Sequence, residues 1–359
     1  MPYLTDMFHD QNATRQRTDD VAVKSVAGFD PDAFADRLGQ RILGQPEAVS
    51  AVARALSIAH AGIADPGRPL ASVLLVGPTG IGKTELIRQV AAEIRTGPDD
   101  LCRIDMAALA QEHYAASFSG APPGYAGSKE SFTLFDKNKI EGDPYTPGIV
   151  LFDEVEKADP TVIRALLHVL DSGQLRLANG RERICFRNSY VFMTSNLGSK
   201  AVATAQSANR WSSRWRRLRG FGTAPRDPAT HMHGLVTAAV EEFFDPEFFN
   251  RIDETVIMEP FGTSTARQVT GREVELFTAR LARESVELRV DETVVQFLQD
   301  CGFDPMYGAR GLRRTIRSHL IAPAAECVLR GRTTPTARIV IKARMVGGSV
   351  AVTLADRAA

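Results

Sequence analysis

The stretch Ala71-Ser-Val-Leu-Leu-Val-Gly-Pro-Thr-Gly-Ile-Gly-Lys-Thr84 decides the fold of this chain. Its residues up to Val76 are mostly apolar and have the length of a buried strand, and a helical pattern runs from Lys83 to about Ile94. Between the two lies the pattern G-x-x-x-x-G-K-[ST], in the strand, loop and helix order that phosphate binding requires. We therefore predict an α/β fold with a nucleotide site at this loop.

The glycines and the last two residues of this loop have separate tasks. Gly77, Gly80 and Gly82 let the backbone curl, so that its N–H groups and the helix N-terminus face a polyphosphate. Lys83 then neutralises the outer phosphate charge, and the hydroxyl of Thr84 binds Mg²⁺. The expected cofactors are accordingly ATP and Mg²⁺.

Two later strands end in polar residues that complete such a site. Gly148-Ile-Val-Leu-Phe-Asp-Glu154 is an apolar run closed by two carboxylates, which a purely structural strand would leave unpaired. We expect Asp153 to hold the Mg²⁺ and Glu154 to orient and activate the attacking water. Tyr190-Val-Phe-Met-Thr-Ser-Asn196 ends in an amide suited to position this water, although an Asn at a strand end also caps turns.

The rest of the chain predicts two domains after a polar leader. Strand-length runs alternate with helical patterns up to about Asp253, which favours a parallel sheet covered on both faces. After Pro260 the pattern becomes helical and closes with two short strands around Gly347-Gly348. We expect a mobile leader at 1–28, a large α/β ATPase domain at 29–260, and a small, mainly helical lid domain with a terminal β-hairpin at 261–359.

Individual elements follow from the same patterns. The sheet strands are expected at 71–76, 101–105, 148–153 and 189–194. Asn179-Gly180 within 175–184 predicts a solvent-facing hairpin. The lid domain is expected to have helices at 263–283, 291–300 and 309–329, and strands at 337–343 and 349–354.

The composition of the 359 residues excludes several classes of protein. With 44% hydrophobic and 24% charged residues, the chain is globular rather than disordered or fibrous. Its 43 basic residues balance its 43 acidic ones, so no global field attracts it to nucleic acid or anionic lipid. No apolar run suits a signal peptide or a membrane span, so we expect a cytoplasmic protein without membrane contact. The four cysteines lack a C-x-x-C pair and are interpreted as reduced core thiols.

These motifs together resemble the AAA+ ATPases, and in particular the C-terminal ATPase module of the ClpB, ClpA and ClpC unfoldases. The resemblance covers the chain from about Asp32 to about Leu354 and implies a sheet domain and a lid domain assembled as a hexameric ring, with ATP between subunits. The matching segments are Arg41-Ile-Leu-Gly-Gln45, Gly77 to Glu85, Arg103-Ile-Asp-Met106, Gly120-Ala-Pro-Pro-Gly-Tyr-Ala-Gly127, Leu151-Phe-Asp-Glu-Val-Glu-Lys157, Met193-Thr-Ser-Asn-Leu-Gly198, Phe249-Asn-Arg-Ile-Asp253 and Tyr307-Gly-Ala-Arg310.

The resemblance also implies roles for single residues. Ile42 and Leu43 would line the adenine pocket. Asn196 would be the first sensor of the γ-phosphate, Arg310 the second sensor, and Arg251 an arginine finger for the neighbouring subunit's site. The expected catalytic residues are therefore Lys83, Glu154, Asn196, Arg251 and Arg310. Loop contacts to the nucleotide would come from Gly77, Pro78, Thr79, Gly80, Ile81, Gly82, Lys83, Thr84 and Glu85.

The segment Gly120 to Gly127 predicts what the motor acts on. An aromatic residue between glycines is a poor structural element but a good grip on an extended chain. In the family, the tyrosine at the position of Tyr125 projects into an axial pore and pulls polypeptide, so Tyr125 and Ala126 are the expected substrate contacts. The leading hypothesis is an ATP-driven protein unfoldase or remodelling chaperone.

Three other functions stay open. The first is a dedicated assembly factor for one partner enzyme, and the second is the ATPase subunit of a Clp-type protease. The third is a nucleic-acid motor that uses 209–220, which holds both tryptophans and only basic charges. This stretch would alternatively dock an adaptor or pack on its own domain. A ClpP-type peptidase is not expected, because Arg219-Gly-Phe-Gly222 has arginine where peptidase-binding members carry an aliphatic residue, and nucleic acid is not expected either.

Overall fold

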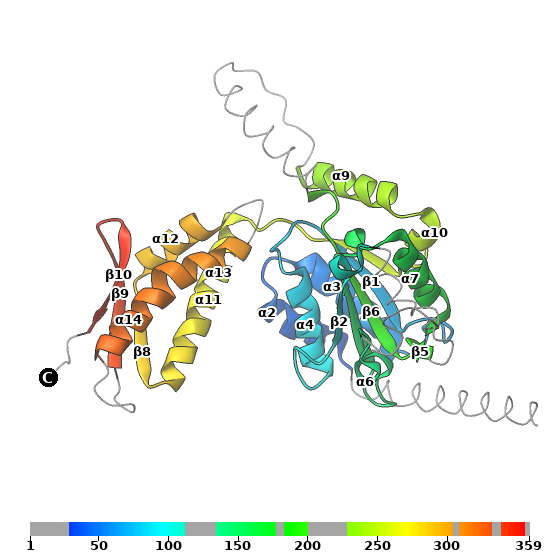
Figure 1. Cartoon of the computed structure of the whole chain (residues 1–359), viewed down its shortest axis with the longest axis horizontal. Helices are drawn as coiled ribbons and strands as arrows, with labels where there is room; N and C mark the ends of the chain where they lie inside the picture. Colours follow the sequence, from blue (N-terminus) through cyan, green and yellow to red (C-terminus); the bar gives the residue numbers. More distant parts are fainter. Residues whose placement is uncertain are drawn as a thin grey trace, which may run out of the picture. The chain divides into compact units, whose positions relative to one another are not determined.

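The computed structural model describes residues 29–111, 134–176, 183–199, 228–303, 309–331 and 339–355 (Figure 1). The chain forms two compact units. The first extends to Met258 without Pro78–Ile81, and the second consists of Glu259 onwards together with Pro78–Ile81. This division falls beside the boundary at residue 260 that the sequence predicts.

A five-stranded parallel sheet with the order β2-β3-β6-β1-β7 forms the centre of the first unit. Every residue of β1, β3 and β6 is buried, as expected for central strands that are covered on both faces. The parallel α/β fold is thus confirmed, with one edge strand, β7, that the sequence patterns do not predict. The strands are β1 (Ala71–Val76), β2 (Cys102–Asp105), β3 (Gly148–Asp153), β6 (Ser189–Ser195) and β7 (Glu254–Ile257).

Helices cover both faces of this sheet. Figure 1 shows α3 and α4 on one side of the sheet and α7 on the other. Side-chain caps fix several starts: Asp30 accepts hydrogen bonds from the backbone at the start of α2, and Asp159 does the same for α7. The helices are α2 (Pro31–Arg41), α3 (Pro46–His60), α4 (Lys83–Ile94), α6 (Lys137–Glu141), α7 (Pro160–Ser172), α9 (Pro228–Phe243) and α10 (Pro246–Phe249), with the short helices η1 (Met106–Leu109) and η2 (Val155–Lys157).

The two strands of the hairpin predicted at 175–184 are present, but the prediction that the hairpin faces solvent is wrong for one of its faces. Strands β4 (Gln174–Arg176) and β5 (Arg183–Cys185) pair antiparallel, with Leu175 opposite Ile184. Both of these side chains are buried and belong to the main hydrophobic core. A ribbon with period-2 alternation has two faces, and here the apolar one packs inward. The predicted turn at Asn179-Gly180 lies outside the described residues.

The second unit combines helices with a three-stranded sheet of order β10-β9-β8. The predicted terminal hairpin is present, and Gly347 and Gly348 form its turn with φ of 58° and 81°. Strand β8 is an unpredicted addition that pairs parallel to β9. The elements are α11 (Thr263–Arg283), β8 (Val286–Val290), α12 (Glu292–Gly302), α13 (Arg310–Ile316), the π-helical turn η3 (Arg317–Ile321), α14 (Ala322–Gly331), β9 (Ile339–Val346) and β10 (Ser349–Leu354).

The second unit has a hydrophobic core of its own. Leu298 of α12, Leu312 of α13 and Leu320 of η3 are fully buried, and Ile341 of β9 lies in the same cluster. Because these residues come from consecutive helices and from the sheet, the cluster fastens the helices onto the inner face of the sheet.

The cysteines agree only in part with the interpretation as core thiols. All four are free thiols. Cys102 is buried, and burial raises the pKa of its thiol, so it is a neutral core residue. Cys301, however, is exposed at the end of α12, so the core interpretation is wrong for this residue. The helical pattern of apolar residues alone does not distinguish Cys301 from its buried neighbours in α12.

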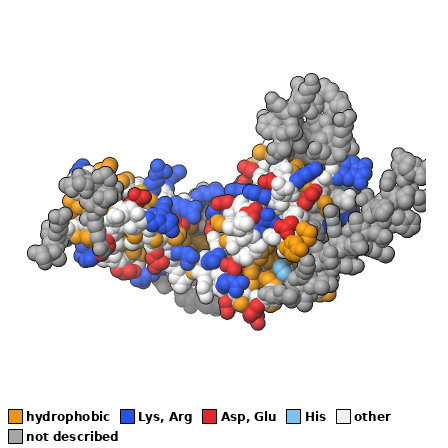
Figure 2. All heavy atoms as spheres, turned by 90° about the horizontal axis from the view of Figure 1, so that it is seen from below, with side chains coloured by type: hydrophobic (Ala, Val, Ile, Leu, Met, Phe, Trp, Pro, Cys, Tyr) orange, Lys and Arg blue, Asp and Glu red, His pale blue; other side chains and the backbone are white. Residues whose placement is uncertain are grey.

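Two further observations concern membrane spans and surface charge. Among the residues that the structure describes, no helix is long and apolar enough to cross a membrane. Figure 2 shows Lys and Arg side chains intermingled with Asp and Glu side chains over the described surface on the face in view. The basic stretch 209–220 lies outside the described residues.

Candidate nucleotide site

The predicted site residues of the first unit gather where β1, β3 and β6 end. These strands are adjacent and parallel, so their carboxyl ends meet at one edge of the sheet. In open α/β sheets, ligands bind outside this edge. Strand β1 leads into the glycine loop at Gly77, β3 ends at Asp153, and β6 ends one residue before Asn196.

At three positions of the loop from Gly77 to Gly82, the backbone has a conformation that any residue other than glycine would adopt only with strain. Gly77, Gly80 and Gly82 have φ of 153°, 77° and 101°, a region that L-residues rarely adopt. The N–H of Gly77 donates to the carbonyl of Ser195 at 3.1 Å, which ties the loop to the end of β6. Helix α4 then begins at Lys83, so its first N–H groups, which have no acceptor within the helix, face the inside of the loop. This geometry can receive a polyphosphate.

Lys83 bridges the loop and the end of β6. Its side chain is only 8% exposed. Its Nζ donates to the carbonyl oxygen of Gly77 at 2.6 Å and to Oδ1 of Asn196 at 2.8 Å. A buried ammonium needs polar partners, and these two oxygens hold it at the mouth of the loop. There it is placed to meet an anionic group.

Asp153 and Thr84, the two predicted magnesium ligands, face each other. The Thr84 hydroxyl lies 3.5 Å from Oδ1 of Asp153, and the Thr194 hydroxyl donates to the same oxygen at 2.5 Å. Asp153 is 7% exposed and has a carboxylate at the strand end beside a hydroxyl. Carboxylate and hydroxyl oxygens are the hard donors that Mg²⁺ prefers. The donor set therefore fits the predicted ion.

Arg103 is a site residue to which the sequence analysis gives no role. It lies on β2, next to β3 in the sheet, and its Nε and Nη2 donate to Oδ2 of Asp153 at 3.0 and 2.5 Å. Its side chain is 57% exposed. The guanidinium thus balances the charge of the buried carboxylate from the solvent side. Arg103 belongs to a segment that matches the family, Arg103-Ile-Asp-Met106, but nothing in that segment predicts a contact with Asp153.

Glu154 has an unusual backbone at the point where the strand stops. Its φ of 61° and ψ of 54° are left-handed, a conformation that costs a non-glycine residue about 1 kcal/mol or more. Its N–H donates to the hydroxyl of Thr194 at 3.0 Å, which holds this conformation. As a result, the two neighbouring carboxylates point in different directions. Asp153 faces Thr84, while Glu154 faces the amide of Asn196, whose Nδ2 lies 3.2 Å from Glu154 Oε1.

Asn196 has a second acidic partner, Glu156, which sequence reasoning missed. Oε1 of Glu156 accepts from the backbone N–H of Asn196 at 3.2 Å and from its Nδ2 at 3.1 Å. Glu156 belongs to η2, immediately after Glu154 and Val155. Its position within Leu151-Phe-Asp-Glu-Val-Glu-Lys157 was visible, but its partner was not.

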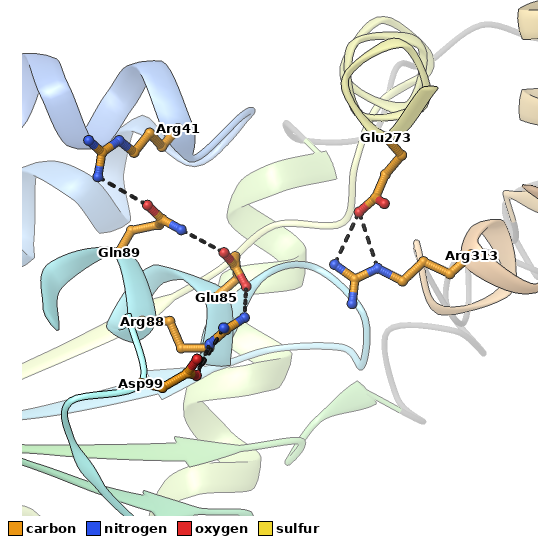
Figure 3. A network of polar contacts seen from close by, with 7 residues as sticks. All are labelled: Arg41, Glu85, Arg88, Gln89, Asp99, Glu273 and Arg313. Carbon is orange, nitrogen blue, oxygen red and sulfur yellow. Dashed lines mark hydrogen bonds and ion pairs between the residues drawn. The ribbon is translucent and has the colours of Figure 1, made fainter. Parts of the chain in front are cut away.

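Glu85, a predicted loop contact, has its carboxylate engaged along helix α4. Its two oxygens accept from Arg88 at 3.1 Å and from Gln89 at 2.7 Å. Figure 3 shows these bonds as part of a chain that continues from Gln89 to Arg41 and from Arg88 to Asp99. Any contact of Glu85 with a nucleotide would then come from its backbone.

The remaining predicted residues lie on other elements or outside the described residues. Ile42 is buried directly after α2, and Leu43 is half-buried. Arg251 forms an ion pair with Asp171 at 3.0 Å, and both side chains are about half exposed. Arg310 begins α13 of the second unit, where Figure 3 shows a separate ion pair between Arg313 and Glu273. The predicted substrate contacts Tyr125 and Ala126 lie outside the described residues.

Comparison with known proteins identifies both units. Residues 68–255 match the family model of the AAA domain (Cdc48 subfamily). Residues 262–341 match the model of the C-terminal, D2-small domain of ClpB protein. A solved structure, the closed-state reconstruction of Hsp104 with ATPγS and FITC casein, aligns with a TM-score of 0.73 and 28% identity. The alignment covers 90% of this chain and 51% of that one.

Relatives of similar length carry a different kind of name. An "ATP-dependent protease ATP-binding subunit-like protein" of Rhodococcus erythropolis is 61% identical over 98% of this chain and 99% of its own length. A protein of Pseudomonas aeruginosa with the same description, named AmiB, is 40% identical over 92% and 93%. Chaperone protein ClpB 1 of Thermosynechococcus vestitus is 38% identical over 82% of this chain, which spans only 32% of that protein. The chain thus belongs to the AAA+ ATPases of the Clp type, as its motifs predict.

Proposed function

We propose that this chain hydrolyses Mg-ATP in a homo-hexameric ring and uses the reaction to unfold or remodel polypeptide threaded through an axial pore. The observation that carries the proposal is the cluster of Lys83, Asp153, Glu154 and Asn196 at the carboxyl edge of the parallel sheet. Family membership adds the ring and the polypeptide, which the geometry of one chain does not supply.

The cluster supports a division of labour among its side chains. Lys83 would bind the outer phosphate oxygens, since its ammonium already faces polar oxygens at the mouth of the loop. Glu154 would accept a proton from water at the carboxylate that now contacts Asn196. Asn196 would hold that water and the γ-phosphate in line. Mg²⁺ bound at Thr84 and Asp153 would neutralise phosphate charge.

Arg251 is suited to act on a neighbouring subunit. Its ion pair with Asp171 is about half exposed, and such pairs contribute roughly 0–1 kcal/mol. The guanidinium can therefore leave Asp171 at little cost when another subunit presents a γ-phosphate. Arg310, exposed at the start of α13, would contact the nucleotide as the second sensor. With Arg251 supplied in trans, hydrolysis would depend on assembly.

Polypeptide as the substrate rests on the relatives and on one segment of sequence. ClpB relatives are named chaperones, and the reconstruction of Hsp104 contains FITC casein. The tyrosine of Gly120 to Gly127 in this chain would grip an extended substrate through its ring, without regard to side-chain identity.

The test is the steady-state ATPase rate with and without a permanently unfolded polypeptide, for wild type and Tyr125→Ala. We expect polypeptide to stimulate the wild type, and Tyr125→Ala to keep its basal rate and lose the stimulation. Stimulation that survives in Tyr125→Ala would remove this tyrosine from the proposed pore. An active ATPase that ignores polypeptide would refute threading and favour a dedicated partner.

A second candidate is the ATPase subunit of a protease. It is favoured by the names of the two relatives that match this chain over nearly their whole length. The test is degradation of labelled casein by this chain mixed with a ClpP-type peptidase. ATP-dependent release of peptides would establish this role. Remodelled but intact casein would favour the chaperone role.

A further inference from the structure

Glu156 directs one carboxylate oxygen entirely at Asn196. Oε1 accepts from the backbone N–H of Asn196 at 3.2 Å and from its side-chain Nδ2 at 3.1 Å. The other oxygen, Oε2, is buried and has no hydrogen-bond partner within the part of the chain that the structure describes. A buried carboxylate oxygen without a partner costs free energy. A glutamate that only capped a turn could avoid this cost by turning toward solvent.

The backbone around Glu156 holds it in this position. Val155, its neighbour in η2, is fully buried and belongs to the main core. The N–H of Lys157 donates to the carbonyl of Glu154 at 2.9 Å, which closes the short helix. Glu154 and Glu156 are therefore fixed on one rigid turn, and both carboxylates meet the same amide of Asn196.

The amide of Asn196 is consequently oriented by three charged groups. Its Oδ1 accepts from Lys83, and its Nδ2 donates to Glu154 and Glu156. When ATP binds and Asn196 acts as the sensor, Glu154 would turn to the attacking water and Lys83 to the phosphate. Glu156 is the one of the three with no expected contact to the reactants, so it can hold Asn196 throughout the cycle.

We propose that Glu156 is a positioning residue for ATP hydrolysis, which holds the backbone and amide of Asn196 in the orientation that meets the γ-phosphate and the attacking water. This inference rests on the proposed role of Asn196. It predicts an effect on turnover rather than on nucleotide binding, because Glu156 acts through Asn196 and not on the phosphates. A misplacement of about 1 Å can cost on the order of 100-fold in rate.

Two substitutions separate reach from charge. Glu156→Gln keeps the length of the side chain and an acceptor oxygen, whereas Glu156→Asp keeps the charge and is shorter by one methylene. If Glu156 positions Asn196 by hydrogen bonds, Glu156→Gln retains most of the turnover. Glu156→Asp and Glu156→Ala then lose about 10- to 100-fold in kcat, with the Kd for a fluorescent ATP analogue within about twofold of wild type. An active Glu156→Asp with a slow Glu156→Gln would overturn the proposal in favour of a purely electrostatic role.

A double-mutant cycle with Asn196→Ala tests whether Glu156 acts through this residue. We expect Glu156→Ala to cause no further loss of kcat in the Asn196→Ala background. Losses that multiply would show that Glu156 works independently of Asn196 and would refute the inference. Wild-type turnover in Asn196→Ala alone would refute the proposed role of Asn196 itself, so the two failures are distinguishable.

Glu141→Ala is the matched control. Glu141 also accepts a backbone N–H through Oε1, from Cys185 at 3.2 Å, but its carbonyl is bonded to Asn188, directly before β6, at the opposite end of that strand from Asn196. We expect Glu141→Ala to change thermal stability without changing kcat. Melting curves of all variants show whether a fall in kcat reflects unfolding. If Glu156→Ala proves too unstable, the comparison of Glu156→Gln with Glu156→Asp still decides the outcome.

Discussion

The two sides of the nucleotide site are each kept in their conformation by a different physical means. On one side, Gly77 to Thr84 is shaped by backbone conformations that only glycine adopts easily, and all its parts are contiguous in sequence. On the other, Asp153, Glu154 and Glu156 are held by hydrogen bonds from residues far away in the sequence. Lys83 links the two sides through Gly77 and Asn196.

This difference assigns different tasks to the two sides. A loop fixed by its own backbone can bind a polyphosphate whether or not the acidic side chains are correctly oriented. The acidic side depends on several side chains at once, so small changes there alter the orientation of reacting groups. Substitutions in the loop should therefore weaken binding, and substitutions among the acids should slow turnover.

The largest expected effect is that of Glu154→Gln. The amide cannot accept a proton from water, so we expect the ATPase rate to fall by about 10²- to 10⁴-fold. Nucleotide binding should stay near that of the wild type, because the loop and Lys83 are unchanged. Turnover and the Kd of a fluorescent ATP analogue, measured on one preparation, check this. A rate within tenfold of wild type would remove Glu154 from the proposed role.

Gly82→Ala tests the loop side. Gly82 has a φ of 101°, and a Cβ there would meet no protein atom within 4 Å, so within the protein itself the cost comes from the backbone. We expect a loss of about 1–3 kcal/mol, seen as weaker nucleotide binding, lower stability or both. Gly39→Ala is the control, since Gly39 lies in α2 with similar free space around its Cβ and no positive φ. It should gain up to about 1 kcal/mol in urea unfolding. Equal behaviour of the two variants would contradict the strain argument.

Contiguous patterns are the part of this molecule that sequence predicts well. The helix from Lys83 to Ile94 follows from the loop and the apolar period behind it, and its bounds agree with the structure. The same holds for strands 71–76 and 148–153. Each of these elements carries its own signal of length, period and end residues.

Most of the missed features depend on contacts between distant residues or on weak patterns. Arg103 reaches Asp153 across 50 residues of sequence, and Glu156 reaches Asn196 across 40. No pattern of spacing encodes either pair, because strand order decides which residues meet. Strand β7 is short and only partly buried, so it shows no continuous apolar run. Strand β8 alternates apolar and polar residues from Val286 to Val290, a pattern that indicates a half-buried strand, so its signal was present and was missed.

The smallest expected effect concerns stability, at a contact that joins the two sides away from the chemistry. Arg95, at the end of α4, donates to the carbonyl of Pro147, directly before β3, at 2.8 Å, and to Asp100 at 3.2 Å. Burial acts to raise the pKa of Asp100, but hydrogen bonds from Arg95 and Thr96 outweigh it and lower the pKa below the ordinary value. A lowered pKa in the folded state stabilises the protein above the ordinary pKa of about 3.9, and this stabilisation is lost as the pH falls through the folded-state value.

Asp100→Asn should therefore lower the free energy of unfolding by about 1 kcal/mol at pH 7, with kcat unchanged. The difference from wild type should shrink as the pH falls from the ordinary value of about 3.9 toward the lower folded-state pKa, because Asp100 is then increasingly protonated. Asp99→Asn is the control, since the Asp99 side chain is 83% exposed and its carboxylate bonds to Arg88 at the surface. Urea unfolding at pH 7 and pH 3.5 checks these expectations. A loss for Asp100→Asn that is the same at both pH values would show that shape, rather than the charge of Asp100, joins α4 to β3.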